Sequence, residues 1–322
     1  MNRFEVVKPT TLAQAKDLVQ EKAWSIYKAG GIDVIDHLKE HLEEPPRLVD
    51  LKGIPGMSEI KVEADGGLRI GALVKLADIG NDERIRKSHA ALAIAAAETA
   101  SPQVRNVATI GGSVLQRPRC WYYRLEEYKC LKKGGDVCYA VGGENRYHVI
   151  FGGGPSYAVH PSNTAVALVA LNATFAFDGP KGARTVAASD FFQLPSKNPQ
   201  VENTLAVAEV LTEVRIPAAS GRSIYDEVRE RQAFDWPLVS MAASVSVDGG
   251  LVKDARIVLG AVAPIPWRSS RAEAALVGKP LNEATLQEVA RAAIVGAAPL
   301  SDNGYKVGLV QTLVRRTLAQ LA

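Results

Sequence analysis

Cysteine is nearly absent from this chain of 322 residues: there are three, all between Cys120 and Cys138. So small and odd a number does not fit the disulfide framework of a secreted domain. No apolar run reaches the roughly 18 residues of a membrane span, and the first 20 residues lack a basic-then-apolar signal pattern. A net charge of +3 is too small to indicate a nucleic-acid partner. We therefore expect a globular, cytoplasmic protein.

Two standard nucleotide-binding motifs are also missing. No glycine turn is followed by the Lys-Ser/Thr of a P-loop, and no G-x-G-x-x-G occurs. What is present is YKAGGID, Tyr27–Asp33, where a predicted strand leads through two glycines to a helix start. Backbone N–H groups at such a start point toward an anion, so a phosphate or pyrophosphate is a possible ligand. A plain glycine turn is the alternative.

A second glycine pair lies in SPQVRNVATIGGSV, Ser101–Val114. Its small residues allow a flat or phosphorylated ligand to approach closely, and Thr109 and Ser113 add hydroxyl groups. The alternative interpretation is a buried irregular loop.

The length of the chain exceeds what one core usually organises, so we expect more than one domain. Residues 1–55 show strand, helix, strand, glycine turn and helix, a small α/β unit. Residues 56–219 follow, with a hairpin at Asp65-Gly66-Gly67, and residues 220–322 form an α+β unit with a hairpin at Asp248-Gly249-Gly250. The predicted helices are Thr11–Glu21, Ala91–Ala100 (which Pro102 must stop), Ala165–Asn172, Ser270–Val277, Glu283–Gly296 and Tyr305–Leu321.

Taken in order, these motifs make the chain resemble the FAD-binding subunits of molybdenum hydroxylases, the family of xanthine dehydrogenase, carbon monoxide dehydrogenase and aldehyde oxidoreductase. The resemblance is carried by AGGxD followed about eighty residues later by RNVATIGGS. It covers essentially the whole chain and continues through HPSNTAVALVALNATFAF, ARTVAASDFF, EVLTEVRIP, FDWPLVSMA, ARIVLGAVAPIPWR and AEAALVGKPL.

The resemblance implies an α+β protein: a two-subdomain FAD-binding fold of the vanillyl-alcohol-oxidase-like type, followed by a C-terminal domain of the carbon monoxide dehydrogenase flavoprotein type. Three positions depart from the family pattern: Ile32 where Thr is usual, Ser113 where Asn is usual, and Asn163 where Asp is usual. The last removes a negative charge near the flavin. The FAD-binding positions implied are Lys28, Ala29, Gly30, Gly31, Ile32, Asp33, Val34, Ser101, Thr109, Ile110, Gly111, Gly112, Ser113 and Asn163.

The function implied is that of an electron-transfer subunit. Electrons would pass from a molybdenum-cofactor large subunit and a 2Fe-2S small subunit through FAD to an external acceptor, within a heterotrimer or its dimer. Substrate oxidation itself would occur on a partner. The alternatives are the flavin subunit of a hydroxybenzoyl-CoA reductase-like enzyme, a stand-alone flavin oxidoreductase, and a binding protein that keeps the fold without FAD. Export with a partner's signal would place the complex in the periplasm.

The cysteines lie in the segment 116–160, which is longer than the usual connection of this family. Their spacing, C-x9-C-x7-C, does not match the short pairs of zinc sites. Between Gln116 and Cys138, six Lys and Arg residues against three Asp and Glu residues leave a local charge of +3. Thiolates on a basic, glycine-rich loop suit an iron–sulfur cluster, whose negative charge such groups stabilise.

The phrases RPRCWY, CLKKGG and YHVIFGG resemble a subset of the family, the bacterial aldehyde oxidoreductase and 4-hydroxybenzoyl-CoA reductase flavin subunits, which carry an extra 4Fe-4S cluster held by four cysteines. This resemblance implies Cys120, Cys130 and Cys138 as ligands and places Ser156 where a fourth cysteine is expected. The open outcomes are ligation by the Ser156 oxygen, a cluster with a non-protein ligand or one iron missing, and three free thiols. His148 and His160 are interpreted as structural, with ligation by His148 as the alternative.

Overall fold

The computed structural model describes residues 1–322 and contains three β-sheets, of three, five and four strands. The first sheet has the parallel order β1-β3-β2, and its central strand is buried at all four residues. Thr11 begins the first helix by accepting a hydrogen bond from the Gln14 N–H, as an N-cap does. The elements of this unit are β1 Glu5–Val7, α1 Leu12–Glu21, β2 Ile26–Lys28, α2 Ile32–Lys39, β3 Arg47–Asp50 and the 3₁₀ turn η1 Leu51–Gly53.

The second sheet is antiparallel in the order β4-β5-β8-β6-β7. Its first hairpin turns where predicted: Gly66 has a φ of 88°, and Asp65 accepts a hydrogen bond from the Gly67 N–H. The elements here are β4 Ile60–Val62, β5 Leu68–Gly71, α3 Leu76–Asn81, α4 Glu83–Ser88, α5 Ala90–Glu98, α6 Pro102–Arg105, α7 Ile110–Leu115, α9 Asn163–Ala170, β6 Thr174–Gly179, β7 Gly182–Ala187, α10 Ala188–Phe191 and β8 Val210–Ile216.

One expectation for this region is corrected, and one alternative interpretation is excluded. Pro102 does not stop the alanine-rich helix α5, which already ends at Glu98; it begins α6, with Ser101 as the cap. Proline is well suited to this first position because its missing N–H has no partner there in any case. The second glycine pair lies not in an irregular loop but inside the short helix α7.

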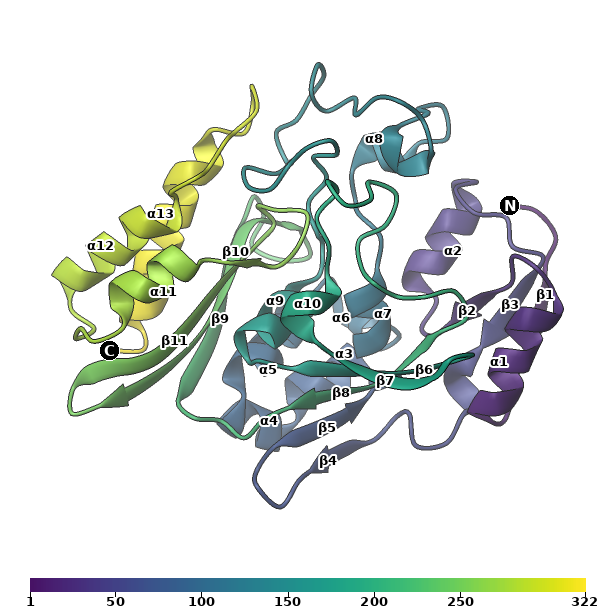
Figure 1. Cartoon of the computed structure of the whole chain (residues 1–322), viewed down its shortest axis with the longest axis horizontal. Coiled ribbons are helices and arrows are strands. Elements are labelled where there is room, and N and C mark those ends of the chain that lie inside the picture. The colour runs from purple at the N-terminus through teal and green to yellow at the C-terminus, as the bar shows by residue number, and fades with distance from the viewer.

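The third sheet has the order β12-β11-β10-β9, and three helices cover one of its faces (Figure 1). The predicted hairpin joins β10 and β11, whereas β9 was not anticipated from the sequence. Helices α5 and α9 lie between this sheet and the five-stranded sheet. The elements are β9 Arg222–Arg229, β10 Pro237–Asp248, β11 Leu251–Gly260, β12 Trp267–Arg268, α11 Ser270–Leu276, α12 Glu283–Ala293 and α13 Tyr305–Ala319.

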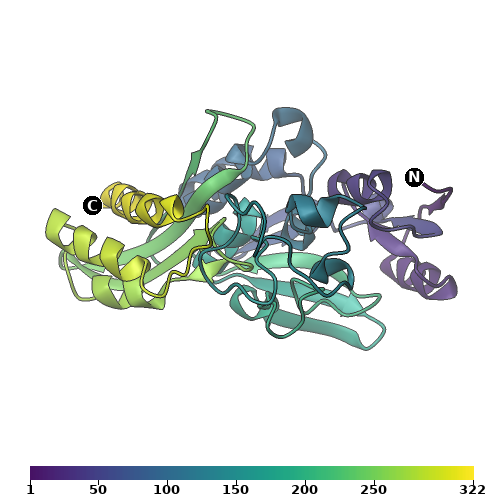
Figure 2. The same cartoon turned by 90° about the horizontal axis from the view of Figure 1, so that it is seen from above.

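Residues 116–162, between α7 and α9, form a long irregular segment that we call the insertion. It contains only α8, Trp121–Arg124, and the 3₁₀ turn η2, Leu131–Lys133. Figures 1 and 2 show it running across the molecule between α2 and the C-terminal helices. Ile150 and Phe151 near its end belong to the hydrophobic core of the C-terminal unit. None of the helices is both long and apolar enough to cross a bilayer.

Candidate functional site

The start of α2 offers free backbone donors. Gly31 is its N-cap, with a φ of 93°, and supplies no side chain to accept from the first turn. The N–H groups from Gly30 to Val34 have no acceptor within the protein. Because the first N–H groups of a helix also carry the positive end of its dipole, this turn is chemically suited to an anion such as a phosphate.

Gly30 lies in close contact with the segment that precedes α7. A Cβ atom added at Gly30 would stand 2.3 Å from the Val107 carbonyl oxygen, a backbone atom that cannot rotate away. The two glycine-containing motifs, about eighty residues apart in sequence, are therefore side by side at this point. Only glycine allows that approach.

Asp33, in the first turn of α2, is engaged by the insertion. Its carboxylate accepts from the Arg117 N–H at 2.8 Å, from Arg119 at 2.5 Å and from Arg124 at 2.8 Å. Burial alone would raise the pKa of Asp33, but Arg119 and Arg124 outweigh it and hold that pKa below its usual 3.8. The carboxylate thus holds two arginines of the insertion beside the free N–H groups.

The N–H groups of the α7 turn, by contrast, are already satisfied. Ile110 donates to the Val74 carbonyl, Gly111 to the Ala72 carbonyl and Ser113 to the Thr109 carbonyl, while Gly112 donates to the Thr109 hydroxyl. The Ser113 hydroxyl takes part in a buried group with Ser162 and Thr164, at 3.0 and 2.9 Å. A ligand could approach this turn closely because it contains two glycines. The turn has few N–H groups left to donate to such a ligand.

Two further positions named from the sequence also have protein partners. The Ser101 hydroxyl accepts from the Val104 N–H as the cap of α6. Lys28 forms an ion pair of 2.9 Å with Asp50 and donates to the Ala29 carbonyl. Both side chains are therefore bonded to protein groups. No hydrogen bond links either of them to the N–H groups of Gly30–Val34.

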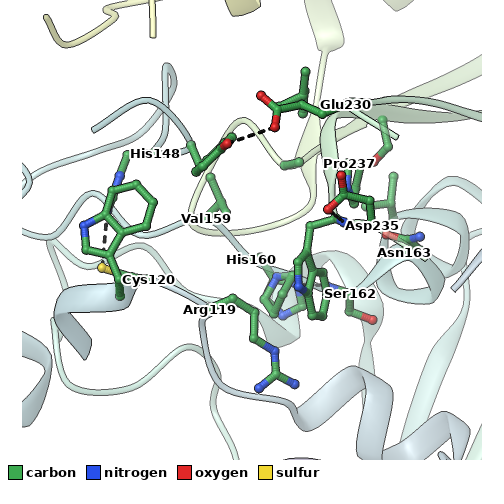
Figure 3. A pocket seen from close by; sticks show the side chains of 18 of the residues that line it. Arg119, Cys120, His148, Val159, His160, Ser162, Asn163, Glu230, Asp235 and Pro237 are labelled. Atoms are coloured by element: carbon green, nitrogen blue, oxygen red, sulfur yellow. Dashed lines mark hydrogen bonds between the residues drawn. The ribbon is translucent and has the colours of Figure 1, made fainter. Parts of the chain in front are cut away.

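A cavity of about 350 Å³ lies where the insertion, α9 and the β9–β10 loop meet (Figure 3). Aromatic side chains and imidazoles from different elements line it, together with charged groups of both signs. This mixture of flat apolar walls and a few polar groups is typical of a site for a cofactor or small molecule. The lining includes Arg119, Cys120, Trp121, Tyr147, His148, His160, Ser162, Asn163, Glu230, Asp235 and Trp236.

Arg119 connects this cavity to the start of α2. One end of its guanidinium group is paired with Asp33, while the group lies 5.2 Å from the centre of the Trp236 ring on the cavity wall. The Ser113–Ser162 hydroxyl contact makes a second connection, from α7 to the start of α9. An elongated ligand could therefore contact the α2 turn at one end and the cavity at the other.

Asn163 lines the cavity at the first turn of α9, and sequence reasoning missed its partner. Its amide nitrogen donates to Glu227 Oε2 at 2.9 Å. Tyr225 donates to the same oxygen at 2.6 Å, and the Arg229 Nε lies 2.9 Å from Glu227 Oε1. Burial raises the pKa of Glu227, against the opposing effects of Tyr225 and Arg229. Nothing in the sequence links positions 64 residues apart on different elements.

The three cysteines lie near one another in the insertion. The pKa of the Cys120 thiol is raised to about 11, mainly by burial, and the nearby Cys138 and Cys130 contribute in the same direction. Cys130 is buried, whereas Cys120 and Cys138 are partly exposed. No group of three or more His, Cys, Asp or Glu side chains is arranged to hold a metal ion. The donor chemistry of three thiols suits an iron–sulfur cluster, but their present arrangement is not a closed coordination site.

His148, not Ser156, is the residue in contact with a thiol. Its Nε2 lies 3.2 Å from Cys120 Sγ, and its Nδ1 is buried without a partner (Figure 3). Burial and the charge of Lys306 lower the pKa of His148 to about 4, so the imidazole is neutral at neutral pH. Ser156 is buried beside Lys132 and Glu202, around a void of about 10 Å³.

Basic residues of the insertion serve to dock it. Lys132 pairs with Glu202 at 2.5 Å, and Arg117 pairs with the same carboxylate at 2.7 Å. Arg124 binds Asp36 as well as Asp33. The local excess of positive charge seen in the sequence is thus largely neutralised by acidic groups outside the insertion.

Comparison with known families gives two matches that together span the chain. Residues 2–219 match the family model of the FAD binding domain in molybdopterin dehydrogenase. Residues 223–321 match that of the carbon monoxide dehydrogenase flavoprotein C-terminal domain. The gap between the two matches ends at the first residue of β9, Arg222, where the third sheet begins.

Individual proteins give the same result. The chain is 35% identical to the aldehyde oxidoreductase FAD-binding subunit PaoB of Escherichia coli (strain K12), over 100% of this chain and 98% of that protein. It is 29% identical to the carbon monoxide dehydrogenase medium chain of Hydrogenophaga pseudoflava, over 98% and 96% of the two chains. The solved carbon monoxide dehydrogenase of that organism superposes with a TM-score of 0.79 at 28% identity, covering 99% of this chain and 97% of that one. Quinoline 2-oxidoreductase from Pseudomonas putida 86 gives a TM-score of 0.78 at 26% identity.

Proposed function

Because the chain belongs to the family of FAD-binding subunits of molybdopterin dehydrogenases, we propose that it holds FAD between the α2 turn and the cavity, and that it is the electron-transfer subunit of an aldehyde oxidoreductase-like enzyme. The observation that carries the proposal is the row of uncommitted N–H groups at Gly30–Val34, next to the contact of Gly30 with Val107. Such a turn holds the pyrophosphate of a dinucleotide without a basic side chain.

The residues proposed to hold FAD have different tasks. Gly30, Gly31 and Ile32 offer backbone N–H groups to the phosphates, and the missing threonine hydroxyl at position 32 does not affect those donors. Thr109–Ser113 supply a close-packed wall of small residues. Asn163 and the aromatic groups of the cavity face the end that receives the flavin ring. The remaining positions hold these segments in place: Lys28, Ala29, Asp33, Val34 and Ser101.

FAD, when bound, supplies a carrier that takes up two electrons and releases them to an acceptor. The protein's part is to orient the ring, to exclude water from one side and to set the electrostatic environment. Arg119, Asn163 and Trp236 line the cavity with one positive, one neutral polar and one aromatic group. None of these groups forms a substrate-oxidising centre, so we propose that oxidation occurs on a partner.

The partners proposed are a molybdenum-cofactor large subunit and a 2Fe-2S small subunit, in a heterotrimer or its dimer. The likeness to PaoB over the full length favours an aldehyde as the substrate of the complex. We propose that the complex is cytoplasmic, with the periplasm, reached through a partner's signal, as the alternative.

The test is to purify the full chain alone and together with its partner subunits. The chain alone should carry flavin absorbance, about one FAD per chain, and no aldehyde oxidation; the complex should oxidise aldehyde and reduce an external acceptor. Aldehyde turnover by the chain alone would reject the electron-transfer role and favour a stand-alone flavin oxidoreductase. A chain that contains no flavin and takes up none from solution would reject the proposal entirely.

For the insertion, we propose a 4Fe-4S cluster held by Cys120, Cys130 and Cys138, with Ser156 at the position of the fourth ligand. Support comes from the proximity of the thiols and from Arg, Lys and glycine residues in the same segment. The contact of Cys120 with His148 adds a neutral imidazole that can donate a hydrogen bond to a cluster-bound sulfur.

Iron quantitation and electron paramagnetic resonance of the full chain test this proposal. About four irons per chain support a full cluster, about three indicate that the iron facing Ser156 is lost, and none identifies three free thiols. Ser156→Cys should convert a three-iron form to a four-iron form. Ser156→Ala should leave a three-iron form unchanged but reduce the iron content of a cluster that the serine oxygen ligates.

A further inference from the structure

Glu227 forms a buried hydrogen-bonded group behind Asn163. The Glu227 side chain is 4% exposed and comes from β9 of the C-terminal unit, whereas Asn163 begins α9 in the second unit. Their contact of 2.9 Å is therefore made across the junction of the two units. Tyr225 donates to the same oxygen, Oε2, at 2.6 Å, and the Arg229 Nε forms an ion pair with Oε1 at 2.9 Å without the geometry of a hydrogen bond.

This contact determines which way the Asn163 amide is turned. An ionised carboxylate can only accept, so the NH₂ group of Asn163 must face Glu227. Glu227 is not part of the cavity lining, whereas Asn163 is (Figure 3). The carbonyl oxygen Oδ1 is then the atom of the Asn163 side chain left for the cavity. Asn163 thus presents an acceptor to a ligand in the cavity. The negative charge of Glu227 lies behind Asn163, on the side away from the cavity.

An aspartate at position 163 would be incompatible with this arrangement. Its carboxylate oxygen would stand at the same 2.9 Å from Glu227 Oε2, with two acceptors facing each other and no donor between them. Two carboxyl groups so close cannot both ionise, and one must hold a proton. Asparagine at 163 and glutamate at 227 are therefore a matched pair.

We propose that Glu227 is a positioning residue of the flavin site: it orients Asn163 and provides, from behind the cavity wall, the negative charge that position 163 lacks. The proposal rests on FAD binding in this cavity. A fixed negative charge near a flavin opposes electron uptake, because the reduced ring is more negative than the oxidised ring. Glu227 consequently lowers the potential of the bound flavin. The other charged groups around it are Arg229, Glu98 and Asp226.

The experiment is a charge-exchange cycle in the full-length chain, with FAD affinity measured by fluorescence titration and the flavin midpoint potential by spectroelectrochemistry. Asn163→Asp should weaken FAD binding by about tenfold. Glu227→Gln should shift the midpoint potential to a more positive value. In the double variant, the glutamine NH₂ can donate to the aspartate, so FAD affinity should return to within about threefold of the wild type.

Glu209→Gln is the matched control, since Glu209 is also buried and paired with an arginine, Arg184, but has no hydrogen bond to a residue that lines the cavity. It should destabilise the fold and leave the flavin potential unchanged. Independent, additive effects of N163D and E227Q on FAD affinity would overturn the proposal, as would an unchanged potential in E227Q. Absence of FAD from the wild type would instead reject the proposed function itself.

Discussion

The two glycine turns, Gly30-Gly31 before α2 and Gly111-Gly112 within α7, look alike in the sequence but differ in the structure. The first leaves its N–H groups without acceptors, whereas each N–H from Ile110 to Ser113 is bonded to protein. Composition alone does not distinguish them. What separates a turn that can donate to a ligand from one that offers only a surface is whether neighbouring strands and side chains already accept from its N–H groups.

Gly30→Ala is expected to have the largest effect. The new Cβ would stand 2.3 Å from the Val107 carbonyl oxygen, so the backbone must move. We expect a loss of about 3 kcal/mol in the free energy of unfolding and loss of bound flavin. Denaturant unfolding and the flavin absorbance of the purified protein measure the two effects. Gly308→Ala in α13, where the new Cβ meets no atom within 4 Å, is the control and should retain flavin.

Asp33→Asn should loosen the insertion on α2. The change removes one of the two carboxylates that Arg119 and Arg124 share and leaves Asp36 as the other, and we expect a cost of about 2 kcal/mol. Limited proteolysis of residues 116–162 reports the loosening. If the insertion stays as protected as in the wild type, Asp33 does not dock it.

The pH dependence of that docking follows from the lowered pKa of Asp33. Because its folded-state pKa lies below the ordinary 3.8, its contribution is present above pH 3.8 and is lost as the pH falls through the folded value. Protection of the insertion in the wild type should therefore persist down to about pH 4 and then decrease progressively as the pH falls further.

Gly31→Ala tests the first turn without a severe clash. Gly31 has a φ of 93°, a left-handed conformation that costs an alanine about 1–2 kcal/mol. FAD affinity should fall by about tenfold, because the strained turn reorients the N–H groups. Gly31→Asn should lose less, since asparagine tolerates this conformation better than alanine. Equal losses in both variants would show that the conformation of residue 31 is not the cause.

Gly112→Ala should have the smallest effect. Its φ is ordinary for a helix, and the new Cβ would meet only the Thr109 hydroxyl, at 3.1 Å. A change within about 0.5 kcal/mol is expected, because alanine also favours helix. FAD affinity should fall less than in Gly31→Ala, because α7 offers the ligand a close wall and no free N–H group. A loss of flavin equal to that of Gly31→Ala would show that the free N–H groups do not distinguish the two turns.

The sequence predicted much of the fold because many elements have local signals. Asp65-Gly66-Gly67 turns where expected, and the helices near Leu12, Asn163, Ser270, Glu283 and Tyr305 begin within a few residues of their predicted starts. The membership of the family and the mixed α+β fold are confirmed by the comparisons. Helix α7 was missed because six residues with two glycines give no periodic pattern.

The candidate site was harder to predict, since its defining contacts are between distant residues. The sequence placed Asp33 and Asn163 near a ligand, but it did not show that Arg119 binds one and Glu227 the other. Ser113 was named for its hydroxyl group and Ser101 through the family resemblance. The structure finds both hydroxyl groups bonded to other protein groups. Whether a side chain is free to bind a ligand depends on its hydrogen-bond partners in the fold. A single sequence does not show which residues those partners are.

The docking of the insertion also bears on the order in which the molecule is assembled. The hydrogen bonds from Arg117, Arg119 and Arg124 to Asp33 and Asp36 join residues 84 to 91 positions apart. Contacts of such long range close large loops, and the entropy lost in closing them is recovered only once the partners are in place. We therefore expect the thiol-bearing segment to take its shape late, against an already folded α2, so that the surroundings of the three cysteines are completed at the end of folding.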